Sequence, residues 1–362
     1  MSENVQTRDF IEWDETLEKI ATSSGTSVIL GGTDVGKTTF CRLLVNRLVE
    51  KGKNVAIIDA DVGQSEVGPP TCIGMAFVEK KIATLSELQV QALAFVGGVN
   101  PSNFLPEHIA GVVKLAAQIG DKTLVVDTSG YIQGYNAHRL MRIELDLLAP
   151  SHIIALQRKD ELRPILQSVR HRRDRTIYTP SIPSIIGKKT ASFRANRREM
   201  RFASYFQTST EYEFSFDEVA LGGTWLGGAD PLAAHLEKFI SEVFGTRNRL
   251  YYAELAGRRL GLMLASPVEP HSADLGVVME HFKTRELSVT IAPNLKNLIL
   301  GLEDRKGRLL GLGILAGLDF KRRTLKILTP LRASGAVSKV CFGRQRIDPD
   351  GADAGLLRPE DC

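Results

Sequence analysis

The feature that most constrains this chain is a glycine-rich stretch between a short apolar run and a helical pattern. Residues 31–38 match G-x-x-x-x-G-K-T; residues 27–30 are typical of a buried strand, and residues 38–51 of an amphipathic helix. Glycines in this context let successive backbone N–H groups face a β-phosphate. We therefore expect a P-loop that binds ATP or GTP. Its binding residues are expected to be Gly31, Gly32, Thr33, Asp34, Val35, Gly36, Lys37, Thr38 and Thr39.

Side chains in and after this loop indicate phosphate and metal chemistry. In such a motif Lys37 reaches the β/γ oxygens and the Thr38 hydroxyl binds Mg²⁺. Asp59, Asp61 and Asp127 lie at the ends of apolar runs, where carboxylates beside a P-loop handle Mg²⁺ or a nucleophile's proton. Asp59 and Asp61 share one side of an extended chain, so one can orient Mg²⁺ while the other accepts a proton. The spacing leaves Asp59 and Asp127 as competing metal ligands.

Apolar runs alternate with helical patterns through the first part of the chain. Such fully apolar strands predict a mostly parallel sheet covered by helices on both faces, so the fold class is α/β, a P-loop NTPase. Strands are expected at residues 27–30, 55–59, 124–127 and 152–156, and helices at residues 38–51, 107–119 and 137–148.

After residue 206 the pattern changes to short β-rich runs, with an expected hairpin turn at residues 304–307. This change predicts a smaller antiparallel β-domain. The runs lie at residues 250–266, 286–291, 298–302, 309–318 and 324–328. The expected organisation is a lead-in at 1–24, a P-loop domain at 25–206, the β-domain at 207–347 and a polar tail at 348–362.

Composition limits the class of protein. The chain has 362 residues, of which 43% are hydrophobic and 24% charged, as in soluble globular proteins. Its start lacks the pattern of a signal peptide, and no apolar run reaches the ~18 residues of a membrane span. The four cysteines form no C-x-x-C pair and have no zinc-site spacing, which indicates reduced thiols. We therefore expect a cytoplasmic protein without a membrane partner.

Positive charge is concentrated in one segment. Residues 158–201 contain 13 Lys and Arg against 4 Asp and Glu, while the net charge of the whole chain is +4. On a helix, Arg194, Arg198 and Arg201 lie at i, i+4 and i+7 and share one face. Three guanidinium groups on one face suit phosphate, either a transferred γ-phosphoryl group or a nucleic-acid backbone. A merely solvated basic face is the alternative.

Several short motifs follow one another in a set order. They are T-D-V-G-K-T at residues 33–38, D-V-G-Q at 61–64, P-S-N at 101–103, T-S-G-Y-I-Q-G at 128–134 and F-R at 193–194. Over about residues 25–206 this order resembles the polynucleotide 5′-hydroxyl kinase family, the Clp-type RNA kinases of pre-mRNA cleavage, tRNA splicing and rRNA processing. The resemblance is to a short form without the N-terminal domain of eukaryotic members. It implies an ATP- and Mg²⁺-dependent kinase whose partners are 5′-hydroxyl ends of RNA, with DNA ends as a second acceptor.

The resemblance also implies roles on the donor side. Lys37 would stabilise the transferred phosphoryl group, and Thr38 would bind Mg²⁺. A basic lid at about residues 188–206 would close over the nucleotide. Its catalytic arginines would be Arg194, Arg198 and Arg201.

On the acceptor side, the resemblance makes Asp61 the general base that takes the proton of the 5′-hydroxyl. Gln64 belongs to the same substrate-side loop, and Asn103 would contact the first phosphate of the nucleic acid. Tyr131 stands where the family has a Trp that stacks on the terminal base, so the π-face is smaller here.

Two other functions fit parts of the sequence. Residues 127–130 have the D-x-x-G form of GTPases, and Q-R-K-D at 157–160 is a loose variant of the guanine-specifying N-K-x-D. These features fit a regulatory GTPase or ATPase switch, which a strong preference for GTP over ATP would favour. The altered loop at Asn100 also fits a catalytically weak RNA-binding scaffold that keeps ATP as a structural ligand.

Overall fold

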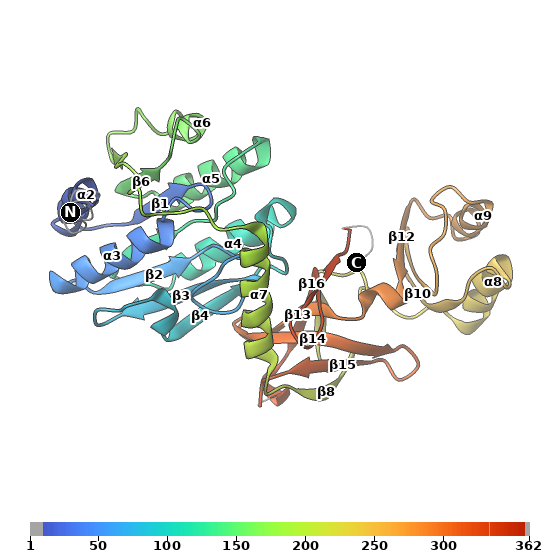
Figure 1. Ribbon diagram of the computed structural model, residues 1–362. Coiled ribbons are helices and arrows are strands. Elements are labelled where there is room, and N and C mark those ends of the chain that lie inside the picture. Colours follow the sequence, from blue (N-terminus) through green and yellow to red (C-terminus); the bar gives the residue numbers. More distant parts are fainter. Residues whose placement is uncertain (1–9, 333, 359–362) are drawn as a thin grey trace. The chain divides into compact units, whose positions relative to one another are not determined.

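The computed structural model describes residues 10–332 and 334–358 (Figure 1). The chain divides into two compact units, Met1–Arg201 and Phe202–Cys362, each with its own hydrophobic core. The boundary falls inside one helix, α7 (Ala191–Phe206). We describe each unit by itself.

The first unit is built on a mixed sheet, which has seven strands among the described residues in the order β4-β3-β2-β5-β1-β6-β7. Strands β2, β5, β1, β6 and β7 are parallel, while β3 and β4 continue the sheet antiparallel beyond β2. The prediction of a mostly parallel sheet is confirmed, and the antiparallel edge is new. The bounds are β1 (Ser27–Gly31), β2 (Val55–Asp59), β3 (Cys72–Val78), β4 (Val90–Phe95), β5 (Thr123–Asp127), β6 (His152–Leu156) and β7 (Thr176–Tyr178).

Helices cover both faces of this sheet, as predicted. Alternate residues of a strand point to opposite faces; Ile29 packs in the cluster formed with α2 and α3, while Val28 and Leu30 pack in the cluster formed with α4 and α5. The helices are α2 (Ile11–Ala21), α3 (Lys37–Glu50), α4 (Leu105–Ala116), α5 (Tyr135–Leu148) and α6 (Arg163–Leu166), with short 3₁₀ turns η1 (Leu85–Glu87) and η2 (Pro101–Asn103).

The segment expected to be a lead-in, residues 1–24, contains a core helix in its described part. Trp13, Leu17 and Ile20 of α2 are fully buried. The indole of Trp13 packs edge-on against Phe40 of α3, with ring centroids 5.0 Å apart, and its Nε1 donates to the Ser181 carbonyl at 2.8 Å. The helix that follows the P-loop therefore has α2 as its packing partner.

The strand register places the predicted site at one edge of the sheet. Ile29 pairs with Asp127 across β1 and β5, and Asp59 pairs with Asp127 across β2 and β5. Because the carboxyl ends of parallel strands meet at one edge, the P-loop, Asp59 and Asp127 are brought together there.

The second unit contains two sheets, and it is less purely antiparallel than predicted. A small sheet, β10-β11-β12, has a parallel β11–β12 pair joined through α9, and the larger sheet β17-β16-β13-β14-β15-β8 adds β9 parallel to β16. The strands are β8 (Thr210–Ser215), β9 (Ala220–Gly222), β10 (Leu250–Ala256), β11 (Arg259–Leu264), β12 (Glu286–Ile291), β13 (Leu298–Glu303), β14 (Leu309–Asp319), β15 (Thr324–Thr329), β16 (Lys339–Ile347) and β17 (Asp353–Leu356). The helices are α8 (Ala234–Phe244) and α9 (Ala273–Phe282), with 3₁₀ turns η3 (Ala292–Leu295) and η4 (Ser334–Ala336).

Two local expectations for this unit have different outcomes. The hairpin at residues 304–307 joins β13 to β14, with Gly307 at φ 70°, as predicted. The polar tail at 348–362 differs from expectation in its described part, because β17 pairs antiparallel with β16 and Leu357 is buried. The strand pairing and the buried side chain of Leu357 therefore hold this segment on the larger sheet. Residues 359–362 lie outside the described part.

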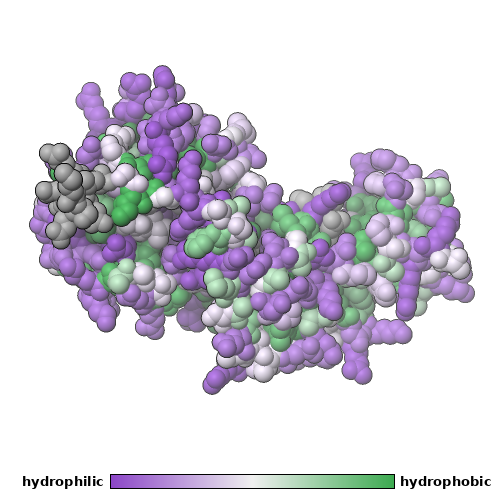
Figure 2. Space-filling model, viewed as in Figure 1, coloured by the Kyte–Doolittle hydropathy of each residue, from purple (hydrophilic) through white to green (hydrophobic). Residues whose placement is uncertain are grey.

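Hydrophilic side chains cover most of the face shown in Figure 2, and hydrophobic ones form small separate groups. Among the described residues, no helix has the length and apolar character needed to cross a membrane. The cytoplasmic location expected from the sequence stays a prediction.

Candidate active site

The P-loop has the backbone that its sequence predicts. Asp34 and Gly36 adopt positive φ values of 58° and 90°. The φ of Gly36 favours glycine, because L side chains rarely adopt that conformation, and a Cβ atom there would also lie 2.4 Å from Ile186 Cδ1. Lys37 is buried at the start of α3, and its Nζ donates to the Gly32 carbonyl at 2.9 Å. It forms no ion pair with a described carboxylate, so its charge is available to an anion in the loop.

The arrangement of Thr38 and Asp127 fits a Mg²⁺ site. Thr38 Oγ1 donates to Asp127 Oδ2 at 2.6 Å, while Asp127 Oδ1 is buried and has no hydrogen-bond partner among the described residues. Burial raises the pKa of Asp127, against the lowering effects of the Lys37 charge and the Thr38 hydrogen bond. A bound divalent cation would offset the unfavourable burial of the Asp127 carboxylate. Mg²⁺ prefers such oxygen ligands together with phosphate and water. No group of three or more His, Cys, Asp or Glu among the described residues forms a separate metal cluster.

Asp59 has a different environment from the one expected of a metal ligand. Its Oδ2 accepts hydrogen bonds from the backbone N–H groups of Glu66 at 2.6 Å and Val67 at 3.0 Å, and its Oδ1 accepts from Asp61 N at 3.1 Å. Burial, followed by the charge of Asp127, raises the pKa of the Asp59 carboxyl. Asp59 therefore anchors the loop that follows β2. Of the two competing carboxylates, Asp127 is the one with a free buried oxygen, and the metal assignment stays a prediction.

Asp61 follows β2 directly, on the loop that Asp59 holds. Its Oδ1 accepts from the backbone N–H groups of Gly63 at 3.2 Å and Gln64 at 3.0 Å. Its Oδ2 accepts no hydrogen bond from the described residues. One carboxylate oxygen is therefore fixed by its own loop while the other is open to a ligand.

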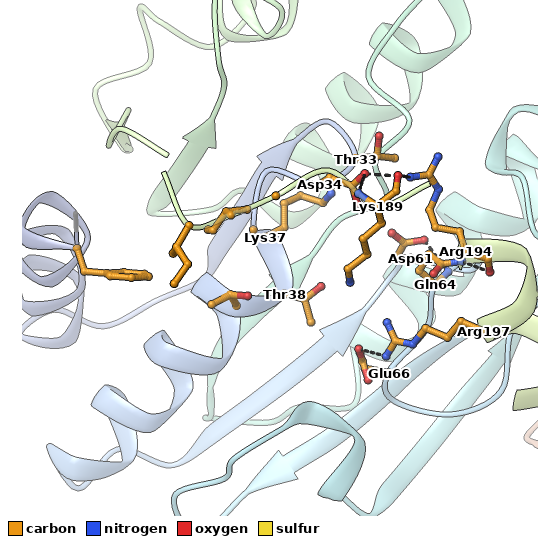
Figure 3. Close-up of a pocket in the computed structure, with 16 residues that line it drawn as sticks. Thr33, Asp34, Lys37, Thr38, Asp61, Gln64, Glu66, Lys189, Arg194 and Arg197 are labelled. Atoms are coloured by element: carbon orange, nitrogen blue, oxygen red, sulfur yellow. Dashed lines mark hydrogen bonds and ion pairs between the residues drawn. The ribbon is translucent and has the colours of Figure 1, made fainter. Parts of the chain in front are cut away.

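A cavity of about 430 Å³ is lined by the P-loop residues Lys37 and Thr38 and by Asp61, while Asp59 and Asp127 lie outside its lining. Figure 3 shows Lys37, Thr38 and Asp61 around it, together with Lys189, Arg194 and Arg197 from the segment that leads into α7 and from α7 itself. The lining also includes the apolar side chains of Phe10, Ile185 and Ile186. The cavity thus offers cations and backbone amides for a triphosphate and apolar side chains for a base.

The arginines of α7 reach the cavity by a different face from the one predicted. Arg194 pairs with Asp34 at 2.9 Å, and Arg197, which the sequence analysis did not single out, pairs with Glu66 and lines the cavity. Arg201 donates to the carbonyls of Glu66 at 3.2 Å and Gly68 at 2.7 Å, and neither it nor Arg198 lines the cavity. The face of α7 that turns toward the P-loop and the loop after β2 therefore carries Arg194, Arg197 and Arg201. The acidic side chain of Glu66 and the nearby backbone carbonyls attract the arginines of this face. Arg198 pairs with none of the described residues.

The acceptor-side residues lie outside the lining of this cavity, apart from Gln64. Asn103 ends η2 and is exposed, and Tyr131 is partly buried against the core. A Cβ atom on Gly63 would lie 2.8 Å from the Val99 carbonyl oxygen, so the Asp61 loop and the loop before Asn103 lie side by side. Gln64 lines the cavity, and its Nε2 donates to the Arg194 carbonyl at 3.1 Å. The contacts of these three residues with RNA stay predictions.

Two of the residues that suggested a GTPase, Gln157 and Arg158, make contacts within the protein. Arg158 Nη2 donates to the carbonyls of Asp34 and Ile186, both at 3.1 Å. Gln157 Oε1 accepts from Leu162 N at 3.1 Å. These side chains brace the P-loop and their own turn instead of facing a nucleotide base.

The fold and site define a P-loop nucleotide-binding protein, and comparisons with known proteins narrow the class. Residues 31–208 match the family model of the mRNA cleavage and polyadenylation factor CLP1 P-loop. Similar proteins are the polyribonucleotide 5′-hydroxyl-kinases of Pyrococcus abyssi (32% identical, 92% of this chain and 90% of the relative) and Methanocaldococcus jannaschii (33%, 91% and 89%). The chain therefore belongs to the Clp1 family of polyribonucleotide 5′-hydroxyl-kinases, as the sequence resemblance predicted.

More distant relatives agree on the fold. The solved structure of a wild-type Clp1p–Pcf11p complex aligns with a TM-score of 0.58 over 96% of this chain and 79% of that chain, at 14% identity. A structure of the extended interface between Pcf11p and Clp1p gives a TM-score of 0.59 at 14% identity, over 96% of this chain and 80% of that chain. At this identity the likeness supports the fold alone.

Proposed function

We propose that this chain transfers the γ-phosphate of ATP to the 5′-hydroxyl end of RNA, with Asp61 as the general base. The observation that carries the proposal is the position of Asp61, whose carboxylate lines the same cavity as Lys37 and Thr38. Its Oδ2 is open to a ligand, while Oδ1 is held by Gly63 and Gln64. A base and a phosphate-binding loop that face one cavity are what phosphoryl transfer to a hydroxyl requires.

On the donor side, the triphosphate of ATP would lie along the P-loop, with the backbone N–H groups and Lys37 around its β- and γ-phosphates. Thr38 and Asp127 would hold Mg²⁺, which when bound neutralises charge on the phosphate oxygens. The base would pack on the apolar side chains in the cavity lining, such as Phe10 and Ile186.

In the transfer step, the 5′-hydroxyl oxygen forms a bond to the γ-phosphorus while the bond from that phosphorus to the β–γ bridging oxygen breaks. ADP leaves, and the hydroxyl proton passes to Asp61 Oδ2. Lys37, Arg194 and Arg197 place positive charge around the cavity where charge develops on the equatorial oxygens. The lid roles inferred for Arg198 and Arg201 require α7 to move toward the nucleotide.

On the acceptor side, we infer that the RNA end enters along the Asp61 loop and the loop before Asn103. Gln64, Asn103 and Tyr131 would contact its first nucleotides. The proximity of Gly63 to Val99 supports this path, because it makes the two loops one surface.

The test is incubation of the purified protein with γ-labelled ATP, Mg²⁺ and matched RNA and DNA oligonucleotides that carry 5′-hydroxyl ends. Label on the RNA is expected from the wild type and is expected to be lost in Lys37→Ala and Asp61→Asn. A fully active Asp61→Asn would refute the base assignment. Tight ATP binding without labelled product would instead favour the RNA-binding scaffold.

A further inference from the structure

A buried pair of ionisable side chains lies behind the Asp61 loop, and the transfer step does not use it. His108 on α4 and Glu144 on α5 have side-chain exposures of 0% and 1%, with His108 Nδ1 2.8 Å from Glu144 Oε1. The second ring nitrogen, Nε2, lies 2.9 Å from the carbonyl oxygen of Ala60. Ala60 is the residue between Asp59 and Asp61. The pair therefore joins two helices to the turn that carries the proposed base.

The hydrogen-bond partners determine which atoms carry protons. A carbonyl oxygen only accepts, so His108 Nε2 carries a hydrogen, and a second proton is shared between Nδ1 and Glu144 Oε1. Burial lowers the pKa of His108, but the charge and hydrogen bond of Glu144 outweigh it, so the net shift is upward. The donor that faces Ala60 is present in the neutral and in the charged imidazole, because the carbonyl oxygen can only accept.

The peptide groups around Asp61 are fixed on several sides. The N–H of Ala60 donates to the Asp127 carbonyl at 2.8 Å, which extends the β2–β5 pairing by one residue, and its carbonyl also accepts from Val62 N at 3.2 Å. The N–H of Asp61 donates to Asp59 Oδ1 at 3.1 Å. The general base must keep one carboxylate oxygen free for the substrate. The orientation of the Asp61 side chain is therefore set largely by the position of its backbone. His108 supplies the side-chain contact that holds that backbone from behind.

The same histidine is close in sequence to the acceptor-side loop. It lies in the first turn of α4, directly after η2, and its N–H donates to the Phe104 carbonyl at 2.9 Å. Its side chain thus ties the helix that follows Asn103 to the turn that carries Asp61. A change in this hydrogen bond between His108 and Ala60 would change the distance between the Asp61 carboxylate and a bound hydroxyl.

We propose that His108, held by Glu144, is a positioning residue that fixes Asp61 relative to the acceptor hydroxyl. The proposal rests on the kinase function and on Asp61 as its base. It assigns His108 an effect on turnover and none on ATP affinity, because the pair touches the base loop and not the P-loop.

The test compares His108→Leu, which loses the donor to Ala60, with His108→Gln, whose amide N–H can still reach that carbonyl. We expect kcat for RNA phosphorylation to fall roughly 10- to 100-fold in His108→Leu, because a misplacement of about 1 Å costs on this order. The Kd for ATP is expected to stay within about twofold, since RT ln 2 is only ~0.4 kcal/mol. His108→Gln is expected to recover most of kcat. Val112→Ala, a buried change on the same helix, controls for lost packing and is expected to lower stability without lowering kcat.

The outcomes separate this proposal from the function on which it rests. If the wild type labels no RNA, the kinase function fails. If the wild type labels RNA and Asp61→Asn does not, while His108→Leu keeps the wild-type kcat, only the positioning role fails. It also fails if ATP affinity falls together with kcat, or if His108→Gln is as slow as His108→Leu. Should His108→Leu not fold, Glu144→Ala and Glu144→Gln make the same comparison, because a glutamine amide keeps a partner for Nδ1 and an alanine methyl group does not.

Discussion

Arg194 Nη1 lies 2.9 Å from Asp34 Oδ2, and this ion pair joins α7 to the P-loop. The backbone N–H of Lys189 donates to the same oxygen at 3.1 Å. An acidic side chain in an anion-binding loop is unfavourable for a triphosphate unless a cation neutralises it. The charge that the P-loop presents to ATP therefore depends on the start of α7.

From this relationship we expect Arg194→Ala to weaken ATP binding about tenfold, equivalent to about 1.4 kcal/mol. The loss leaves the Asp34 carboxylate unpaired beside the phosphates. Adding Asp34→Asn should recover part of the affinity, because it removes the repulsive charge. Calorimetric titration of both single variants and the double variant measures the coupling. A double variant that binds as weakly as Arg194→Ala would show that Arg194 acts on ATP without Asp34.

Helix α2 packs against the P-loop and α3, so we expect the loss of its largest buried side chain to lower stability. Trp13 is fully buried, and a Cβ atom at Gly36 would lie 3.0 Å from its Cη2 atom. We expect Trp13→Ala to lower the free energy of unfolding by about 3–5 kcal/mol, the usual cost of an aromatic cavity. Denaturant unfolding measures this, with Glu15→Ala on the exposed side of α2 as the matched control. Equal stability of the two variants would contradict the role given to α2.

The same helix shows what sequence reasoning reached and what it missed. The P-loop, its flanking strand and helix, and the carboxylates that end β2 and β5 were predicted, because each has a local pattern. Trp13, Leu17 and Ile20 lie at i, i+4 and i+7, a helical period that could have been recognised despite the acidic residues between them. The acidic residues between these positions make the segment polar on average, which obscures its helical period.

Other parts of the site depend on contacts between distant residues, which local sequence patterns do not predict. The role of Asp59 depends on the amides of Glu66 and Val67 folding back onto it, and no motif marks that return. The face of α7 depends on where Glu66 lies, so equally basic faces could not be ranked from spacing. The partner of His108 is Glu144, 36 positions later on another helix. Such long-range pairs become visible only once the helices are packed.

The contacts of Arg201 predict a role in the stability of the loop after Asp61. Its guanidinium donates to two backbone carbonyls, those of Glu66 and Gly68. We expect Arg201→Ala to destabilise the protein by about 1–3 kcal/mol, because these acceptors lose a charged donor. Thermal or urea unfolding measures the change. Arg172→Ala, which removes an exposed pair with Asp174, is the control and is expected to have little effect. Unchanged stability of Arg201→Ala would mean that the two contacts contribute nothing in solution.

The buried His108 predicts how stability changes with pH. Burial lowers its pKa, but Glu144, the Ala60 carbonyl and the charge of Asp61 raise it, and the net shift is upward from the value of about 6.5 for an unfolded chain. The folded state therefore binds this proton more tightly, so the stabilisation is complete below about pH 6.5 and is lost as the pH rises through the raised pKa. Urea unfolding from about pH 6 to pH 9 should show the wild type losing stability relative to His108→Leu as the pH rises. His171→Leu, a change at an exposed histidine, should follow the wild type. A wild type that gains stability over His108→Leu with rising pH would mean that His108 is held neutral, without the shared proton.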